Sequence, residues 1–164
     1  MKRMRQSLWC LALTLTITSC AARVPEPVGV PPGVPHISWI IMHGDRDNPD
    51  AEFACQSTGP RECVLPASRP GASVFSNVHL YFHGAGKETT YQGSYRPEFL
   101  SDDRSAAHEF PIRTTVKGEE QIANQFVTGI VATTPGTYAL RFAVEAATSG
   151  GSTPIREEIP VRVQ

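Results

Sequence analysis

Two histidines lie four residues apart in the segment His79-Leu-Tyr-Phe-His83. On a helix this spacing brings two imidazoles together on one face, where they can chelate zinc. The surrounding residues favour a β-strand instead, on which positions four apart lie about 13 Å from each other along one face. Zinc–nitrogen bonds are only about 2 Å long, so one ion could not reach both rings. We therefore expect no metal site here and no bound cofactor.

Closely spaced carboxylates form a second candidate site. Asp45, Asp47 and Asp50 occur in the segment Gly44-Asp-Arg-Asp-Asn-Pro-Asp, and such a loop could surround a calcium ion. The calcium loop of helix-loop-helix sites needs a Gly at its sixth position and a Glu at its twelfth, where this chain has Asp50 and Gln56. That motif fails. An irregular weak calcium site and a solvated acidic loop remain open, and we favour the second.

No set of nucleophile, base and orienting group can be assembled from the motifs. The segment His83-Gly-Ala-Gly86 is similar to the oxyanion loop of some esterases, but the chain has no Gly-x-Ser-x-Gly to supply the nucleophile. We therefore predict a protein without catalytic activity. The alternative is a hydrolase that combines scattered residues: His79, His83 or His108 with Asp102 or Asp103.

Composition limits the classes of protein to which the chain can belong. Its 164 residues are 40% hydrophobic and 19% charged, which is enough for one modest domain. Without Lys2, Arg3 and Arg5 of the basic start, 12 of the 15 basic residues remain against 16 acidic ones, a charge of −4. This charge disfavours a nucleic-acid binder. Beyond the start, no stretch reaches the 18 or more apolar residues that are typical of a membrane span.

The first 19 residues predict an export signal, with a basic start, an apolar core at 7–18 and small residues at 19–22. Ile17-Thr-Ser-Cys20 resembles the lipobox of bacterial lipoproteins, in which an aliphatic residue stands three before an obligatory Cys. The resemblance implies that acyl chains such as palmitate are attached to Cys20, the new N-terminus. Because Ala21 follows Cys20, the family pattern favours the outer membrane. An ordinary signal peptide cut after Ala21 or Ala22, and an uncleaved signal anchor, are the alternatives.

Residues 20–36 are expected to be a tether between this Cys and the folded domain. The segment carries five prolines, at positions 25, 27, 31, 32 and 35. Proline fixes φ and has no N–H to donate, so the segment should be extended and span on the order of 50 Å.

The remaining two cysteines, Cys55 and Cys63, form a pair in the exported part of the chain. An oxidising compartment and an even count favour a disulfide. Zinc would need two further ligands, and no Cys-x-x-Cys or clustered His accompanies the pair. We therefore predict a structural disulfide.

Residues 37–164 predict a single all-β domain, a sandwich of about seven or eight strands. The strand signals are separated by turn-rich gaps, and only Pro97–His108 is compatible with a helix. Pro160 suggests that the last strand lies at a sheet edge, and that strand should pair with the one before it through Gly150-Gly151. The candidate strands are Ser38–Met42, Glu62–Leu65, Val74–His83, Thr89–Tyr95, Phe110–Val116, Ile122–Ala132, Gly136–Ala146 and Ile155–Val163.

The segment Pro135-Gly-Thr-Tyr-Ala-Leu140 resembles the tyrosine-corner region of immunoglobulin-like sandwiches. The resemblance implies that Gly136 and Tyr138 open the penultimate strand and that the phenol returns a hydrogen bond to upstream backbone. Leu140 stands where antibody domains have a Cys, so the inter-sheet disulfide of that family is absent. The resemblance supports an immunoglobulin-like fold and implies no activity.

A candidate binding surface depends on how the strand at 74–83 is placed relative to the one at 89–95. If they form a hairpin in which His83 pairs with Thr89, one exposed face collects Phe75, His79, Tyr81, His83, Tyr91 and Tyr95. Exposed aromatic faces are typical of surfaces that bind sugars or protein partners. A slip of one residue moves Tyr91 and Tyr95 into the core, and this second arrangement agrees better with the binary pattern.

The sequence thus predicts a lipid-anchored protein of the bacterial outer membrane with a non-catalytic β-sandwich. We expect the sandwich to act as an interaction or assembly module for an envelope protein or glycan. An envelope hydrolase and a binder of small ligands or carbohydrates are the alternatives.

Overall fold

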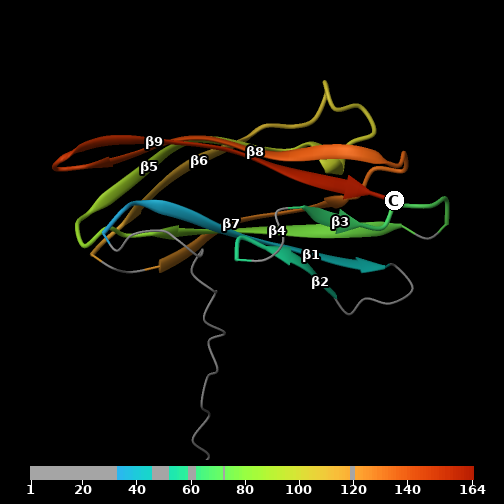
Figure 1. Cartoon of the computed structure of the whole chain (residues 1–164), viewed down its shortest axis with the longest axis horizontal. Coiled ribbons are helices and arrows are strands. Elements are labelled where there is room, and N and C mark those ends of the chain that lie inside the picture. Colours follow the sequence, from blue (N-terminus) through green and yellow to red (C-terminus); the bar gives the residue numbers. More distant parts are fainter. Residues whose placement is uncertain (1–32, 46–51, 59–61, 72, 119–120) are drawn as a thin grey trace, which may run out of the picture.

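The computed structural model describes residues 33–45, 52–58, 62–71, 73–118 and 121–164. Within these ranges the chain is all β, with nine strands in two sheets and one short 3₁₀ turn. The two sheets stack as layers (Figure 1), which confirms the predicted sandwich architecture. No helix in the described ranges is long and apolar enough to cross a membrane. The expected leader and Cys20 lie outside these ranges.

The first sheet, sheet A, has the strand order β2-β1-β4-β7. Each pair of neighbouring strands in this sheet runs antiparallel. One of its strands, β2, was not predicted, because a five-residue segment next to an acidic loop gives too short a signal. The strand bounds are β1 (His36–Asp45), β2 (Glu52–Gln56), β4 (Val74–His83) and β7 (Gln121–Ile130).

The second sheet, sheet B, has the order β3-β9-β8-β5-β6. Its short strand β3 runs parallel to β9, while its other neighbours are antiparallel. The predicted pairing of the last two strands is confirmed, with Thr148 opposite Gly151 at the turn. The bounds are β3 (Cys63–Leu65), β5 (Thr89–Pro97), β6 (Phe110–Val116), β8 (Gly136–Thr148) and β9 (Gly151–Val163).

The core lies between the sheets and follows from period-two alternation. In β8 the predicted inward residues Tyr138, Leu140, Phe142 and Val144 are all at most 4% exposed. Their counterparts in sheet A include Val78, Leu80 and Phe82, which are fully buried as expected. The inner faces of the two sheets are therefore apolar and cover each other.

The predicted hairpin between β4 and β5 is wrong. The two strands belong to different sheets, so the connection at 84–88 crosses from one layer to the other. Both strands have an apolar face, and face-to-face packing buries both, whereas a hairpin would have placed both in one layer. The crossing needs close backbone contact, because a Cβ on Gly84 would lie 1.9 Å from the carbonyl oxygen of Gly118.

The edge predicted at Pro160 is present over most of β9. In the described part of the chain, β3 pairs only with Val161–Val163, while the stretch before Val161 is paired with β8 alone. Pro160 is the last residue before the pairing with β3 begins. Its missing N–H therefore costs no bond to β3.

The segment Pro97–His108 is not a helix. Only Glu98–Leu100 forms a 3₁₀ turn, and the rest crosses the end of the sandwich as a loop. The carbonyl oxygen of Phe99 accepts a hydrogen bond from the N–H of Ala132 at 2.8 Å, which fixes the turn to the loop after β7.

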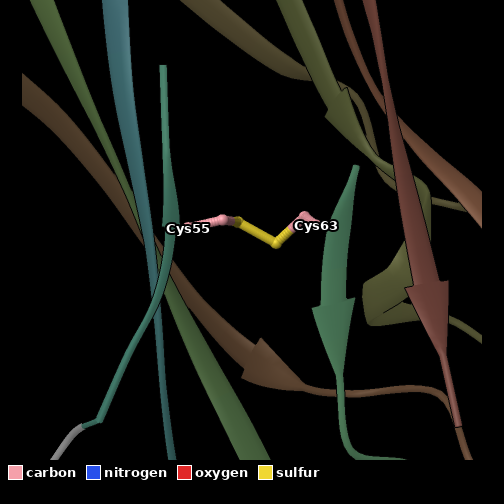
Figure 2. Close-up of a disulfide and its surroundings, with 2 residues drawn as sticks. All are labelled: Cys55 and Cys63. Atoms are coloured by element: carbon pink, nitrogen blue, oxygen red, sulfur yellow. A yellow bond between two sulfur atoms is a disulfide. The ribbon is translucent and has the colours of Figure 1, made fainter. Parts of the chain in front are cut away.

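The predicted disulfide is confirmed and joins the two layers. Cys55 lies on β2 of sheet A and Cys63 on β3 of sheet B, and the bond between them crosses the gap (Figure 2). Their Cα atoms are 5.5 Å apart. Both residues are at most 2% exposed. The bond thus holds the outermost strands of the two sheets together on one side of the sandwich.

Removing the disulfide should lower the free energy of unfolding by about 2.5 kcal/mol, because the cysteines are only 8 positions apart in the sequence and the loop they close is short. Urea unfolding of the Cys55→Ala/Cys63→Ala protein against the oxidised parent measures this difference. Dithiothreitol should have the same effect on the parent and none on the double variant. An equal response of both proteins would contradict the prediction.

Gly93→Ala should destabilise the domain by about 2 to 4 kcal/mol. The backbone of β8 approaches Gly93 so closely that a Cβ would lie 2.1 Å from the carbonyl oxygen of Ala143. Gly150→Ala is the matched control, since its Cβ would have no neighbour nearer than 3.7 Å. Thermal unfolding by circular dichroism compares the two. A shift no larger for Gly93→Ala than for Gly150→Ala would show that the strands separate at little cost.

Candidate binding surfaces

The outer face of sheet A carries three of the six residues predicted to form a binding surface. Phe75, His79 and Tyr81 are half-buried and lie on the side of β4 that faces away from the core. Their strand neighbours add to this side, since Ile40 is opposite His79 and the exposed Ile130 is opposite Phe75. We call these five residues, with the half-buried Met42 beside them on β1, the apolar face of sheet A. A polar pair, Asn77 and Thr128, lies among them.

The other three predicted residues are buried. Tyr91 and Tyr95 are 0% and 2% exposed and belong to the core of sheet B, while His83 is 6% exposed at the end of β4. The exposed six-residue face is therefore not formed. The alternative with Tyr91 and Tyr95 in the core is correct, but the reason is the crossing between sheets rather than a register slip.

His83 belongs to a polar cluster where β1 begins and β4 ends. Its Nε2 lies 2.7 Å from the hydroxyl of Ser38, and its ring stacks on that of His36 with centroids 4.1 Å apart. Burial, and to a smaller extent the neighbouring His36, lower the pKa of His83 to about 4. The phenol of Tyr91 donates to the backbone carbonyls of His36 and His83 from the opposite sheet. Burial raises the pKa of that phenol to about 12.

A histidine beside a serine forms two of the three members of a hydrolytic triad. The pair Ser38 and His83, however, is part of the packed interior. Ser38 is fully buried and His83 nearly so, which leaves a substrate no access to either. A base with a pKa near 4 is also a poor proton acceptor at neutral pH.

The aspartates proposed for a hydrolase cap loops instead. Asp102 accepts hydrogen bonds from the backbone N–H groups of Thr133 at 2.6 Å and Thr134 at 3.0 Å, and these bonds lower the pKa of its carboxyl. Asp103 accepts in the same way from Ser105, at 2.8 Å from the N–H, and its pKa is also lowered. These bonds fix the loop at 101–108. They do not orient a histidine.

Metal ligands do not gather in the described ranges, where no group of three or more His, Cys, Asp or Glu side chains could hold an ion. The structure describes only part of the acidic loop, because Asp47 and Asp50 lie outside the described residues.

A second surface lies on the outer face of sheet B, where a hollow has a volume of about 520 Å³. It forms over two small residues, Ser94 on β5 and Ala143 on β8, which are cross-strand neighbours. Larger charged side chains surround them. The polar residues that line the hollow are Ser94, Arg96, Glu109, Arg141, Arg156, Glu157 and Glu158.

Arg141, in the lining of this hollow, is held by ion pairs within the domain. Its Nε lies 3.3 Å from the carboxylate of Glu98 and its terminal nitrogen 3.4 Å from that of Glu158. The Glu98 side chain is only 9% exposed, so the ion pair compensates a nearly buried charge.

Sequence reasoning did not find this hollow. Its residues come from β5, β8, β9 and the loop before β6, so their proximity depends on the strand order of sheet B. The available signal was the outward position of Arg141 in the alternation of β8, which marks one charged position without naming its neighbours.

Comparisons with known proteins found no match: no family model, no curated protein and no solved structure is similar to this chain.

The low pKa of His83 predicts that the domain loses stability in acid. Between pH 6.5 and about 4 the unfolded chain binds a proton at this histidine that the folded chain does not, so stability falls as the pH falls through this window. His83→Gln should flatten the loss and still offer a hydrogen-bond partner to Ser38. His108→Gln, at an exposed position, is the control and should keep the parent's profile. Urea midpoints from pH 7.5 to 4 measure the effect, and parallel profiles of parent and His83→Gln would refute it.

Proposed function

We propose that this protein is a lipid-anchored module of the bacterial outer membrane that binds an envelope partner through the apolar face of sheet A and catalyses no reaction. The observation that carries the proposal is the apolar face itself. Half-buried apolar and aromatic side chains on the outside of a sheet are typical of contact surfaces.

Export and anchoring are supported by separate features. The disulfide between Cys55 and Cys63 fits an oxidising compartment outside the cytoplasm. The lipobox-like Ile17-Thr-Ser-Cys20 supports attachment by acyl chains at Cys20, and two or more chains make such attachment lasting. A proline-rich tether then holds the domain away from the lipid headgroups.

An immunoglobulin-like topology belongs to the proposal as well. The phenol of Tyr138 donates to the carbonyl oxygen of Thr134 at 2.7 Å, as a tyrosine corner does, and Gly136 opens the penultimate strand. The disulfide lies elsewhere than in antibody domains, because it joins β2 to β3 at the side of the sandwich. Immunoglobulin-like sandwiches commonly serve as binding modules, which agrees with the proposed role.

The anchor is tested by metabolic labelling with palmitate and by fractionation of Cys20→Ser. We expect label on the parent, none on the variant, and movement of the variant from the membrane fraction to the soluble periplasmic extract. Cys10→Ser, in the part removed with the leader, is the control and should leave labelling unchanged. An unlabelled parent would reject the anchor without affecting the proposed surface.

The surface is tested by site-specific photo-crosslinking in native membranes. A photoreactive residue at Ile130, on the apolar face, should give a defined adduct, whereas one at Arg113, an exposed position on the outside of sheet B, should not. Met42→Asp should abolish the Ile130 adduct because it places a charge in the contact. Equal adducts at Ile130 and Arg113, or an adduct that survives Met42→Asp, would reject this face as the contact.

A further inference from the structure

The hollow on sheet B differs from the apolar face of sheet A in both place and chemistry. Its floor is made by the small side chains Ser94 and Ala143. Arg156, on β9, lies opposite Ala143. At about 520 Å³ it is within the size range of small-ligand sites. Six of the ten residues that line it are charged, so a ligand there must satisfy these charges.

Two of its three arginines already have partners. Arg141 is held by two carboxylates, as described above. Arg96 donates from one terminal nitrogen to the carbonyl oxygens of Arg104 and Ser105, the latter at 3.0 Å. Arg156, by contrast, is exposed and makes no ion pair with any described residue. It is therefore the guanidinium at this hollow that can receive a ligand's carboxylate in a bidentate pair.

The opposite side of the hollow carries negative charge. Glu109, in the loop before β6, accepts a hydrogen bond from the hydroxyl of Ser94. Two further carboxylates, Glu157 and Glu158, lie beside Arg156 on β9. Together the three carboxylates repel polyanions such as phosphate esters, and the arginines repel polycations. The lining therefore favours a ligand that carries one negative and one positive group.

The separation of the charged sides sets the length of that ligand. From β9, which holds Arg156, to the loop before β6 the sheet spans two to three strand spacings, or about 10 to 14 Å. An extended peptide advances about 3.4 Å per residue, so three or four residues cover this distance.

We propose that the hollow on sheet B binds a short peptide of three or four residues with free ends, its carboxylate on Arg156 and its ammonium group on Glu109. Neither the lipid anchor nor the apolar face of sheet A is needed for this site. Failure of one proposal therefore leaves the other unaffected.

The test titrates the full-length protein in detergent micelles with four forms of tetra-alanine, observed by the NMR shifts of backbone amides and arginine Nε–H groups. The free peptide should bind and shift the Arg156 signal. Amidation of its C-terminus and acetylation of its N-terminus should each weaken binding by about tenfold or more, because each removes one charge pair. The doubly blocked peptide loses both pairs and should bind most weakly.

Matched variants assign each end of the peptide. Arg156→Gln should weaken the free peptide about tenfold but leave the C-terminal amide unchanged, while Arg156→Lys should restore part of the affinity. Glu109→Gln should likewise weaken binding of the free peptide about tenfold and leave binding of the N-acetylated peptide unchanged. Arg113→Gln, outside the hollow, is the control. All four peptides binding equally, or Arg156→Gln having no effect, would overturn the proposal, as would tighter binding of inorganic phosphate than of the free peptide.

Discussion

The fold depends on the crossing from β4 to β5, which sets two strands with aromatic and aliphatic inner faces against each other across the core. Tyr91 makes the crossing specific, because its buried hydroxyl must find acceptors and finds them on the opposite sheet, at the carbonyls of His36 and His83. One side chain of sheet B thereby fixes the ends of two strands of sheet A. A hairpin between the same strands would leave this phenol without these partners.

Two features distinguish the side of the sandwich where β2 and β3 lie. On one side the disulfide joins β2 to β3, so the outermost strands of both layers are linked covalently. Beyond β3, the open part of β9 contains Pro154 and Pro160, which have no N–H to offer, and the charged residues between them. Strand addition at this edge of β9 is therefore unfavourable.

Strand positions were largely predictable because alternation in segments such as β8 and β9 is a local property. The bounds of Val74–His83 and Phe110–Val116 are the same in the prediction and in the structure. Strand order is not local, and this is why the hairpin was wrong and why one of its two possible registers placed Tyr91 on the surface. The same limit hid the hollow, since Arg141 and Arg156 become neighbours only through the pairing of β8 with β9.

The two outer faces differ because their strands carry different residues at the outward positions. In β4 these positions hold Phe75 and Tyr81 with Asn77 and His79 between them, and a largely uncharged face results. In β8 they hold Arg141 and Ala143, and a charged hollow results. An apolar face gains free energy by excluding water from a large area, while a charged hollow gains it only from paired groups at fixed positions. The first suits a protein surface that covers it and the second a small ligand that fits it. The partner proposed for sheet A and the peptide proposed for sheet B would therefore occupy separate faces of the domain.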